Sequence, residues 1–110
     1  MGRIPFKRLA VDGETVTVEE RDDRGRMASG HPIGGEYTRN KIVIDRYMPT
    51  ESKQVAVLHE ALHHCWERGG VGRYLSGKTE ELVLSLLDSW LWQILRENPE
   101  LARWIAGEEG

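Results

Sequence analysis

The sequence predicts a single α+β domain over residues 1–110, with a small antiparallel or mixed sheet packed on a helix that carries the motif H-E-x-x-H, followed by a long second helix. Runs in which apolar and polar residues alternate, or which are rich in β-branched residues, occur only before residue 46. Helical periodicity dominates the remainder, and all four tryptophans fall there, which predicts that most of the core lies in the C-terminal half. A length of 110 residues suits one modest core.

Composition and charge exclude several classes of protein. The chain is 39% hydrophobic and 30% charged, and its net charge of -3 argues against a dominant electrostatic attraction to nucleic acid. No apolar run approaches the roughly 18–20 residues of a membrane span, and the N-terminus lacks the apolar segment of a signal peptide. Cys65 is the only cysteine, so no intrachain disulfide can form. Together these features predict a cytoplasmic protein that does not bind membranes.

The first part of the chain is expected to begin the sheet. Residues 1–8 are basic and are expected to be loose. A hairpin is predicted over residues 9–20, because Asp12-Gly13 is typical of a type I′ turn and the valines that follow alternate with polar residues. The mixed charges of residues 19–26 predict a solvated loop, and the glycines and proline of residues 27–36 extend it.

Three helices are expected after a β-branched strand at residues 41–45. The first should begin with Thr50 as its N-cap and end at the Gly69-Gly70 pair. The second should begin with Thr79 as its N-cap, after a glycine-rich loop, and end before Pro99, because the residue preceding a proline avoids the helical conformation. A last short helix is expected beyond that break.

The motif H-E-x-x-H consists of His59, Glu60 and His63. Positions i and i+4 project from one face of a helix, so both imidazoles can ligate one ion at the roughly 2.0–2.1 Å typical of Zn²⁺. Glu60 lies about 100° round the helix, where it can act as the general base toward a metal-bound water. The alternative is a pair of packed histidines beside a solvated glutamate. A metal is favoured because both histidines belong to a stripe that is expected to be buried, where ring nitrogens need partners; the other members are Val55, Leu62 and Trp66.

A third protein ligand is expected from the second helix. Glu80 shares its helical phase with the apolar residues of that helix and is favoured over Glu81, which lies on a more polar face. Acidic residues in a first helical turn also occur simply because they complement the helix dipole, which is the alternative. Asp88 is a candidate partner for a histidine N–H, His64 is expected to be another such partner or a surface residue, and Cys65 a small buried one.

A rival motif follows the first helix. Residues 72–79 match G-x-x-x-x-G-K-[ST], the phosphate-binding loop. Such a loop needs a buried strand before it and a parallel sheet after it. Here it follows a helix that ends in two glycines, and the residues after it predict another helix. A flexible connection is the ordinary interpretation, and nucleotide binding is a remote alternative.

Three stretches of the sequence resemble a known family. They are the strand Ile-Val-Ile-Asp, the helix with His-Glu-Ala-Leu-His, and Thr-Glu-Glu-Leu-Val before a long helix that ends Arg-Glu-Asn-Pro-Glu-Leu. They are similar to the small, gluzincin-like zincin metallopeptidases of bacteriophages and prophages, and to the minimal cores of ImmA/IrrE-like and SprT-like peptidases. The resemblance covers roughly residues 34–105. It implies a zincin fold with His59 and His63 as zinc ligands, Glu60 as base, and Glu80 or Glu81 as the last ligand.

The sequence departs from these families in two respects. It lacks the Ala/Asn-rich, Phe-containing pattern that follows the glutamate in ImmA/IrrE-like proteins, and it lacks the cysteine-rich ribbon of some SprT-like proteins. Substrate and biological role therefore do not transfer from the resemblance.

These observations predict a zinc metallopeptidase that acts on a peptide or protein substrate. The strand Ile42–Ile44 could hold an extended substrate if it forms the sheet edge. The principal alternative is a non-catalytic binding module in which zinc only stabilises the fold. The oligomeric state is left open. Candidates for stabilising the oxyanion are Tyr37, Tyr47, Tyr74 and His31.

Overall fold

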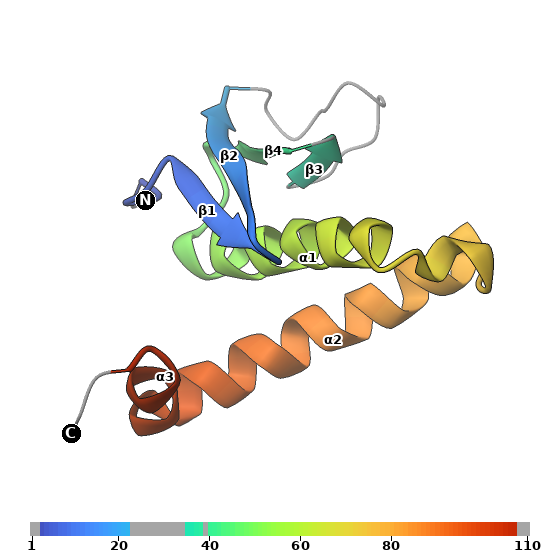
Figure 1. The fold of residues 1–110 in the computed structure, drawn as a ribbon. Coiled ribbons are helices and arrows are strands. Elements are labelled where there is room, and N and C mark those ends of the chain that lie inside the picture. The colour runs from blue at the N-terminus through green and yellow to red at the C-terminus, as the bar shows by residue number, and fades with distance from the viewer. Residues whose placement is uncertain (1–2, 23–34, 39, 108–110) are drawn as a thin grey trace.

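The computed structural model describes residues 3–22, 35–38 and 40–107. Its elements form three layers: a four-stranded sheet, helix α1 against the sheet, and helix α2 on the far side of α1 (Figure 1). The predicted α+β class is confirmed. The elements are the strands β1 (Arg8–Val11), β2 (Glu14–Arg21), β3 (Gly35–Thr38) and β4 (Lys41–Asp45), the helices α1 (Thr50–Arg68), α2 (Gly77–Glu97) and α3 (Pro99–Ile105), and the short 3-10 helix η1 (Val71–Arg73).

The strands β1 and β2 form the predicted hairpin. They pair antiparallel, with Arg8 opposite Thr17. The two turn residues Asp12 and Gly13 have φ angles of 49° and 78°. Two consecutive positive φ angles are typical of a type I′ turn, and aspartate followed by glycine is a sequence that tolerates them. The hairpin prediction is confirmed.

The sheet is mixed, in the order β1-β2-β4-β3. The predicted strand at residues 41–45 is confirmed as β4, but it lies between β2, to which it is parallel, and β3, to which it is antiparallel. It is therefore not the sheet edge, and β3 takes that place. The strand β3 begins within the stretch 27–36 that was expected to be a loop; residues 27–34 lie outside the described ranges.

The charged run at residues 19–26 was expected to be a solvated loop, but its first residues belong to the sheet. The strand β2 extends to Arg21. Glu20 accepts a hydrogen bond of 2.8 Å from Nζ of Lys53 on α1, and both side chains are largely buried. A strand can carry such charges into the interior because each charge meets its counter-ion there.

The core lies between the sheet and α1, and the prediction that it lies mostly in the C-terminal half is wrong. Trp90 and Trp104 belong to α2 and α3, and both are more than half exposed. These two tryptophans therefore belong to an outer layer. The buried apolar cluster is instead Val11, Val16, Val18, Ile42, Ile44 and Val57.

Helix α1 separates the two other layers and presents a different face to each. It begins at Thr50 and has Pro49 at the cap position with no side-chain capping bond, so Thr50 is not the N-cap. The stripe that was expected to be buried, which contains His59 and His63, lies on the side toward α2 and is half-buried. At about 100° per residue this is the side opposite the fully buried face, whose members are Lys53, Val57, Glu60 and His64.

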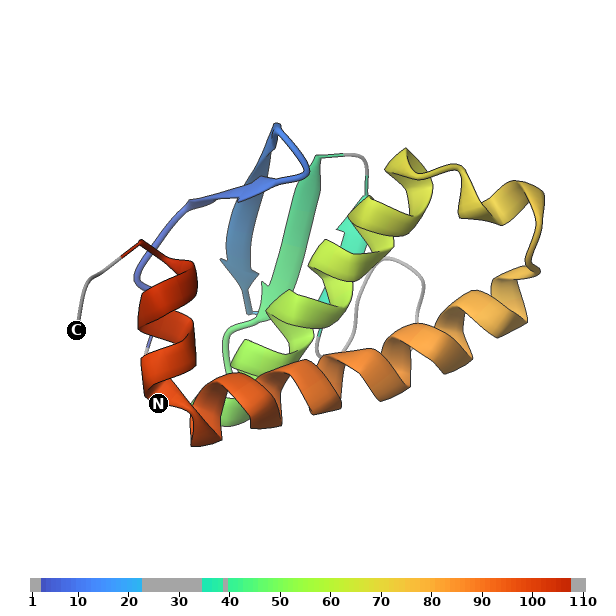
Figure 2. The same ribbon diagram turned by 60° about the horizontal axis from the view of Figure 1, so that its bottom comes forward.

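Helix α2 begins two residues before Thr79, and Ser76 is its N-cap. The Ser76 hydroxyl oxygen accepts a hydrogen bond of 3.2 Å from the Thr79 backbone N–H. The helix ends before Pro99 as predicted, and α3 follows directly, set at an angle to α2 (Figure 2). Within the described ranges no helix combines the length and apolarity needed to cross a bilayer.

Candidate metal centre

The two motif histidines converge on one point between α1 and α2. His59 and His63 lie one turn apart on α1, and their Nε2 atoms are 3.1 Å from each other. Their rings meet edge to face, with centroids 4.7 Å apart. The i, i+4 spacing produces this arrangement because side chains four residues apart stand one above the other on a helix.

A carboxylate from α2 completes a three-residue group. Oε1 of Glu81 lies 2.6 Å from Nε2 of His63 and 3.5 Å from Nε2 of His59. Ligand atoms about 2.0–2.1 Å from a tetrahedral zinc stand roughly 3.3–3.4 Å apart. The separations of 3.1 and 3.5 Å are near this value, and the 2.6 Å between Glu81 and His63 is shorter. His59, His63 and Glu81 therefore form a group that could hold a metal ion.

The other ring nitrogens of the two histidines are held by acidic side chains. Nδ1 of His59 is 2.7 Å from Oδ2 of Asp88, and Nδ1 of His63 is 2.7 Å from Oε2 of Glu80. An ionised carboxylate can only accept hydrogen bonds, so each Nδ1 is the donor. In neutral rings with this tautomer, both Nε2 lone pairs are free to ligate a cation beside the Glu81 oxygen.

The structure reverses the order of preference between the two glutamates. Glu81, not the favoured Glu80, reaches the Nε2 atoms, while Glu80 holds the opposite side of the His63 ring. The side of α2 that faces α1 contains Leu84 and Asp88, three and seven residues after Glu81. The apolar residues were a misleading guide to this phase because some of those used to assign it remain exposed, among them Trp90 and Ile94.

Solvent reaches the group from the Glu81 side. The side chains of His59 and His63 are 16% and 17% exposed, whereas that of Glu81 is 60% exposed. Asp88 is buried. Asp88 and Glu80 thus hold the group on its inner side, and the group is open on the Glu81 side.

Glu60 is not a member of this group. It follows His59 in the chain but belongs to the buried face of α1, between Val57 and His64. It therefore follows a candidate ligand in the chain but lies on the sheet-facing side of α1.

His64 serves a different part of the structure. It is 2% exposed, and its Nε2 atom lies 3.0 Å from Oε1 of Glu14 on β2. Arg68 contacts the other Glu14 oxygen at 3.1 Å, so this trio fastens the hairpin to α1. Of the two residues suggested as partners for the metal ligands, Asp88 contacts one and His64 binds the hairpin. Cys65, expected to be buried, is exposed.

Of the four candidates for stabilising an oxyanion, Tyr47 and Tyr74 are described with their side chains, and neither belongs to the group. The Tyr47 hydroxyl donates to Asp22, and this hydrogen bond raises the pKa of Tyr47. Tyr74 is exposed in the connection between η1 and α2. The side chain of Tyr37 and the whole of His31 are outside what the structure describes.

The segment that matches a phosphate-binding loop has no nucleotide-site context. Residues 72–79 form the end of η1, a turn and the start of α2. They follow a helix, and no strand follows them in the described part of the chain. This placement agrees with the prediction that the segment is a connection between two helices.

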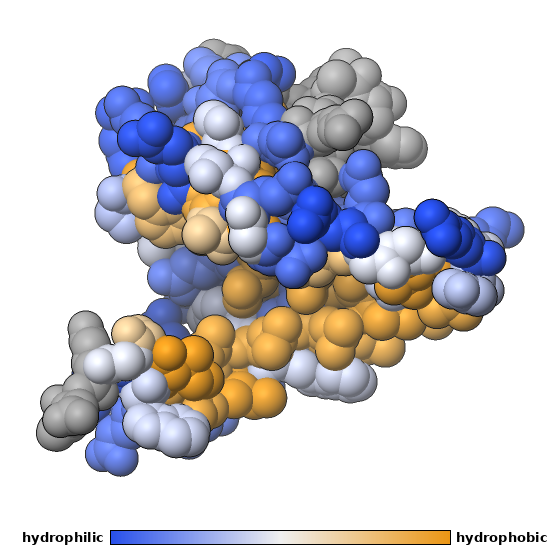
Figure 3. Space-filling view, viewed as in Figure 1, coloured by the Kyte–Doolittle hydropathy of each residue, from blue (hydrophilic) through white to orange (hydrophobic). Residues whose placement is uncertain are grey.

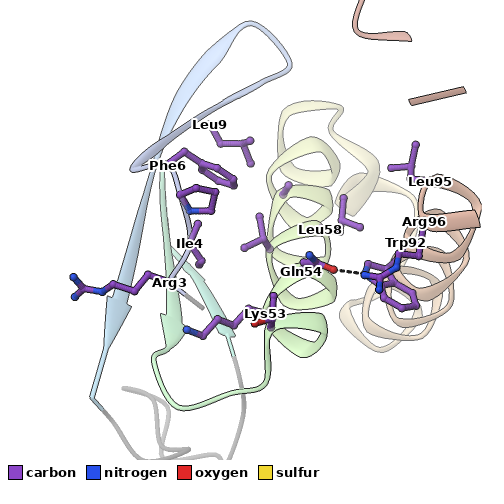
Figure 4. Close-up of a pocket in the computed structure, with 14 residues that line it drawn as sticks. Arg3, Ile4, Phe6, Leu9, Lys53, Gln54, Leu58, Trp92, Leu95 and Arg96 are labelled. Carbon is purple, nitrogen blue, oxygen red and sulfur yellow. Dashed lines mark hydrogen bonds between the residues drawn. The ribbon is translucent and has the colours of Figure 1, made fainter. Parts of the chain in front are cut away.

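Hollows lie where α1 and α2 meet. One of about 450 Å³ borders His63 and Glu80 and is also lined by Trp66 and Arg73. A second, apolar groove of about 490 Å³ lies between the N-terminal segment, α1 and the C-terminal half of α2 (Figure 4). There Nε1 of Trp92 donates a hydrogen bond of 2.8 Å to Gln54. Of these two, only the hollow of about 450 Å³ is lined by a histidine of the group, His63.

No family model matches the sequence, and comparison with curated proteins and with solved structures yields no significant match.

Proposed function

We propose that the protein is a zinc-dependent peptidase with a zincin-like fold and that His59, His63 and Glu81 are its zinc ligands. The observation that carries the proposal is the convergence of both Nε2 atoms on one carboxylate, while Asp88 and Glu80 hold the Nδ1 sides. Two imidazoles and one carboxylate, open on one side, are a donor set that suits catalytic zinc. Neutral imidazoles with a fixed tautomer are the form that ligates metal.

Zinc bound there would lower the pKa of a water molecule and polarise the carbonyl of a peptide bond. The chain supplies the remaining steps. Glu60, next to His59, accepts the proton of the attacking water and passes it to the leaving amine. Glu81 combines ligation with exposure, so the substrate approaches along its side of the group. The adjoining hollow, which Arg73 and Trp66 line, receives the chain beside the scissile bond.

A second function is favoured by one observation, the position of Glu60. Its side chain belongs to the sheet-facing side of α1 rather than to the group of ligand atoms. A zinc-stabilised binding module needs the three ligands and no base, so it does not require the Glu60 side chain to face the group.

The substitution Glu60→Gln separates the two functions, because it keeps the shape of the side chain and removes the base. A peptidase variant should bind zinc as wild type does and lose about 10²–10⁴-fold of its hydrolytic rate. The assay is zinc-dependent fragmentation of lysate proteins and of the chain itself, with the variant as the blank. Equal fragmentation by both proteins, or none by either, argues for the binding module.

A further inference from the structure

Helix α2 carries a stripe of exposed apolar side chains. Leu82, Leu86, Trp90 and Ile94 follow one another at intervals of four residues and are 63%, 45%, 54% and 47% exposed. They occupy the side of α2 away from α1, because the side that packs on α1 contains Leu84 and Asp88. Figure 3 shows apolar surface along much of α2. A continuous ridge of this kind is distinct from isolated exposed residues and marks an interaction surface.

The ridge is complementary to a reversed copy of itself. A twofold axis across the middle of the helix, beside Asp88, would set Leu82 against Ile94 and Leu86 against Trp90. Both ends of the ridge would then meet an aliphatic partner, and the tryptophan would fill the centre with a leucine. Twofold symmetry of this sort is the commonest arrangement of soluble oligomers.

The charges at the two ends of the ridge are opposite. Lys78 lies one turn before Leu82, and Glu97 lies three residues after Ile94. Both are exposed, and neither makes an ion pair with another described residue. Antiparallel packing of two copies brings the lysine of each toward the glutamate of the other, whereas parallel packing brings like charges together. The charge pattern therefore selects an antiparallel second copy of this chain as the partner.

The exposed area matches the core of a modest interface. Large apolar side chains of about 150–250 Å² with these exposed fractions leave roughly 400 Å² of apolar surface on the ridge. A standard interface buries about 800 Å² per partner, of which somewhat more than half is apolar. We propose that the protein forms an antiparallel homodimer through the ridge of α2, independently of the metal group on the other side of the same helix.

Sedimentation equilibrium of the full, untagged chain at micromolar concentrations tests the proposal. Wild type should be dimeric, and Leu86→Glu should weaken association by more than about tenfold, because it places a charge at the centre of the interface. The matched control is Tyr74→Glu, which adds the same charge at an 82% exposed residue outside α2 and should leave the dimer intact. Circular dichroism and zinc content of each variant should match those of wild type, which separates a lost interface from a lost fold or a lost metal site.

A monomeric wild type overturns the proposal, and so does a Leu86→Glu variant that associates as wild type does. The orientation is tested by carbodiimide coupling, which joins a lysine amine to a carboxylate in direct contact. Lys78 and Glu97 of one chain are about 28 Å apart at about 1.5 Å per residue, so a link between them can form only between copies. Mass spectrometry should find this link in the coupled dimer. A coupled dimer linked only through other pairs contradicts the antiparallel register.

Discussion

Nδ1 of His59 lies 2.7 Å from a carboxylate oxygen of Asp88, which stands on a different helix and is 6% exposed. A buried charge is costly unless it is paired, so the contact favours one ring orientation and one tautomer of His59. The same relationship ties α2 to α1 at the group of ligand atoms. In the proposed zinc site, Asp88 would therefore influence the affinity for zinc without being a ligand.

Replacing Asp88 by asparagine should weaken zinc binding by about 10–100-fold, because the side chain keeps its size but no longer supplies the negative charge that raises the basicity of His59. Titration with a competing zinc chelator measures the change. Glu100→Gln removes one charge from the exposed start of α3 and should leave the affinity unchanged. An equal effect of the two substitutions would show that only net charge matters.

Glu81→Gln should weaken zinc binding more than Glu80→Gln. Both substitutions remove one charge from neighbouring residues, but only Glu81 contributes an oxygen within reach of both Nε2 atoms. Loss of a ligand should exceed the roughly 10–100-fold effect expected for Glu80, whose role is to hold Nδ1 of His63. The same chelator titration compares them, and the reverse order would exchange the roles assigned to the two glutamates.

The ion pair between Glu20 and Lys53 should make stability depend on pH in the acid range. Burial alone would raise the pKa of Glu20. Hydrogen bonds from Lys53 and from the Ile4 backbone N–H lower it by more than burial raises it, so the pKa of Glu20 is below the usual value. A lowered folded-state pKa stabilises the fold above the unfolded pKa. This stabilisation is lost as the pH falls through the folded pKa.

Glu20→Gln should therefore lower the free energy of unfolding by about 1–3 kcal/mol at neutral pH and flatten its decline on acidification. Urea denaturation at several pH values measures both. Glu19→Gln is the matched control. Glu19 neighbours Glu20 and pairs with Lys41, but its side chain is 39% exposed, and surface pairs contribute less than about 1 kcal/mol. If the free energy of unfolding of the Glu20 variant falls on acidification as steeply as that of wild type, the lowered pKa assigned to Glu20 is contradicted.

The parts of the structure that local patterns control could be predicted from the sequence. The Asp12-Gly13 turn, the strand at residues 41–45 and the ends of α1 and α2 at Gly69 and Pro99 all depend on a few neighbouring residues. The pairing of His59 with His63 depends only on helical geometry and was also predictable.

The parts that depend on what covers each surface could not be predicted. The phase of α2 was inferred from its apolar residues, but Trp90 and Ile94 among them are exposed, so the inferred face pointed to Glu80. The strand β2 continues through charges because Lys53, far along the chain, pairs with Glu20. The interval of seven residues between Glu81 and Asp88 is the signal that could have identified the face of α2 that packs on α1. Two acidic residues on one face of a helix can contact two histidines on one face of a neighbouring helix.

The zinc content of the protein tests the central claim most directly. Protein purified without a metal-affinity tag should contain about one zinc per chain by elemental analysis, and His59→Ala should contain almost none. Cys65→Ser is the control. It removes the one thiol, a group that can bind zinc outside the proposed site, and the variant should retain the zinc. Removal of zinc by a chelator should lower the melting temperature of wild type, since a metal that binds only the native state stabilises it. A zinc content near zero that does not rise when zinc is added would contradict the assignment of His59, His63 and Glu81 as a metal site.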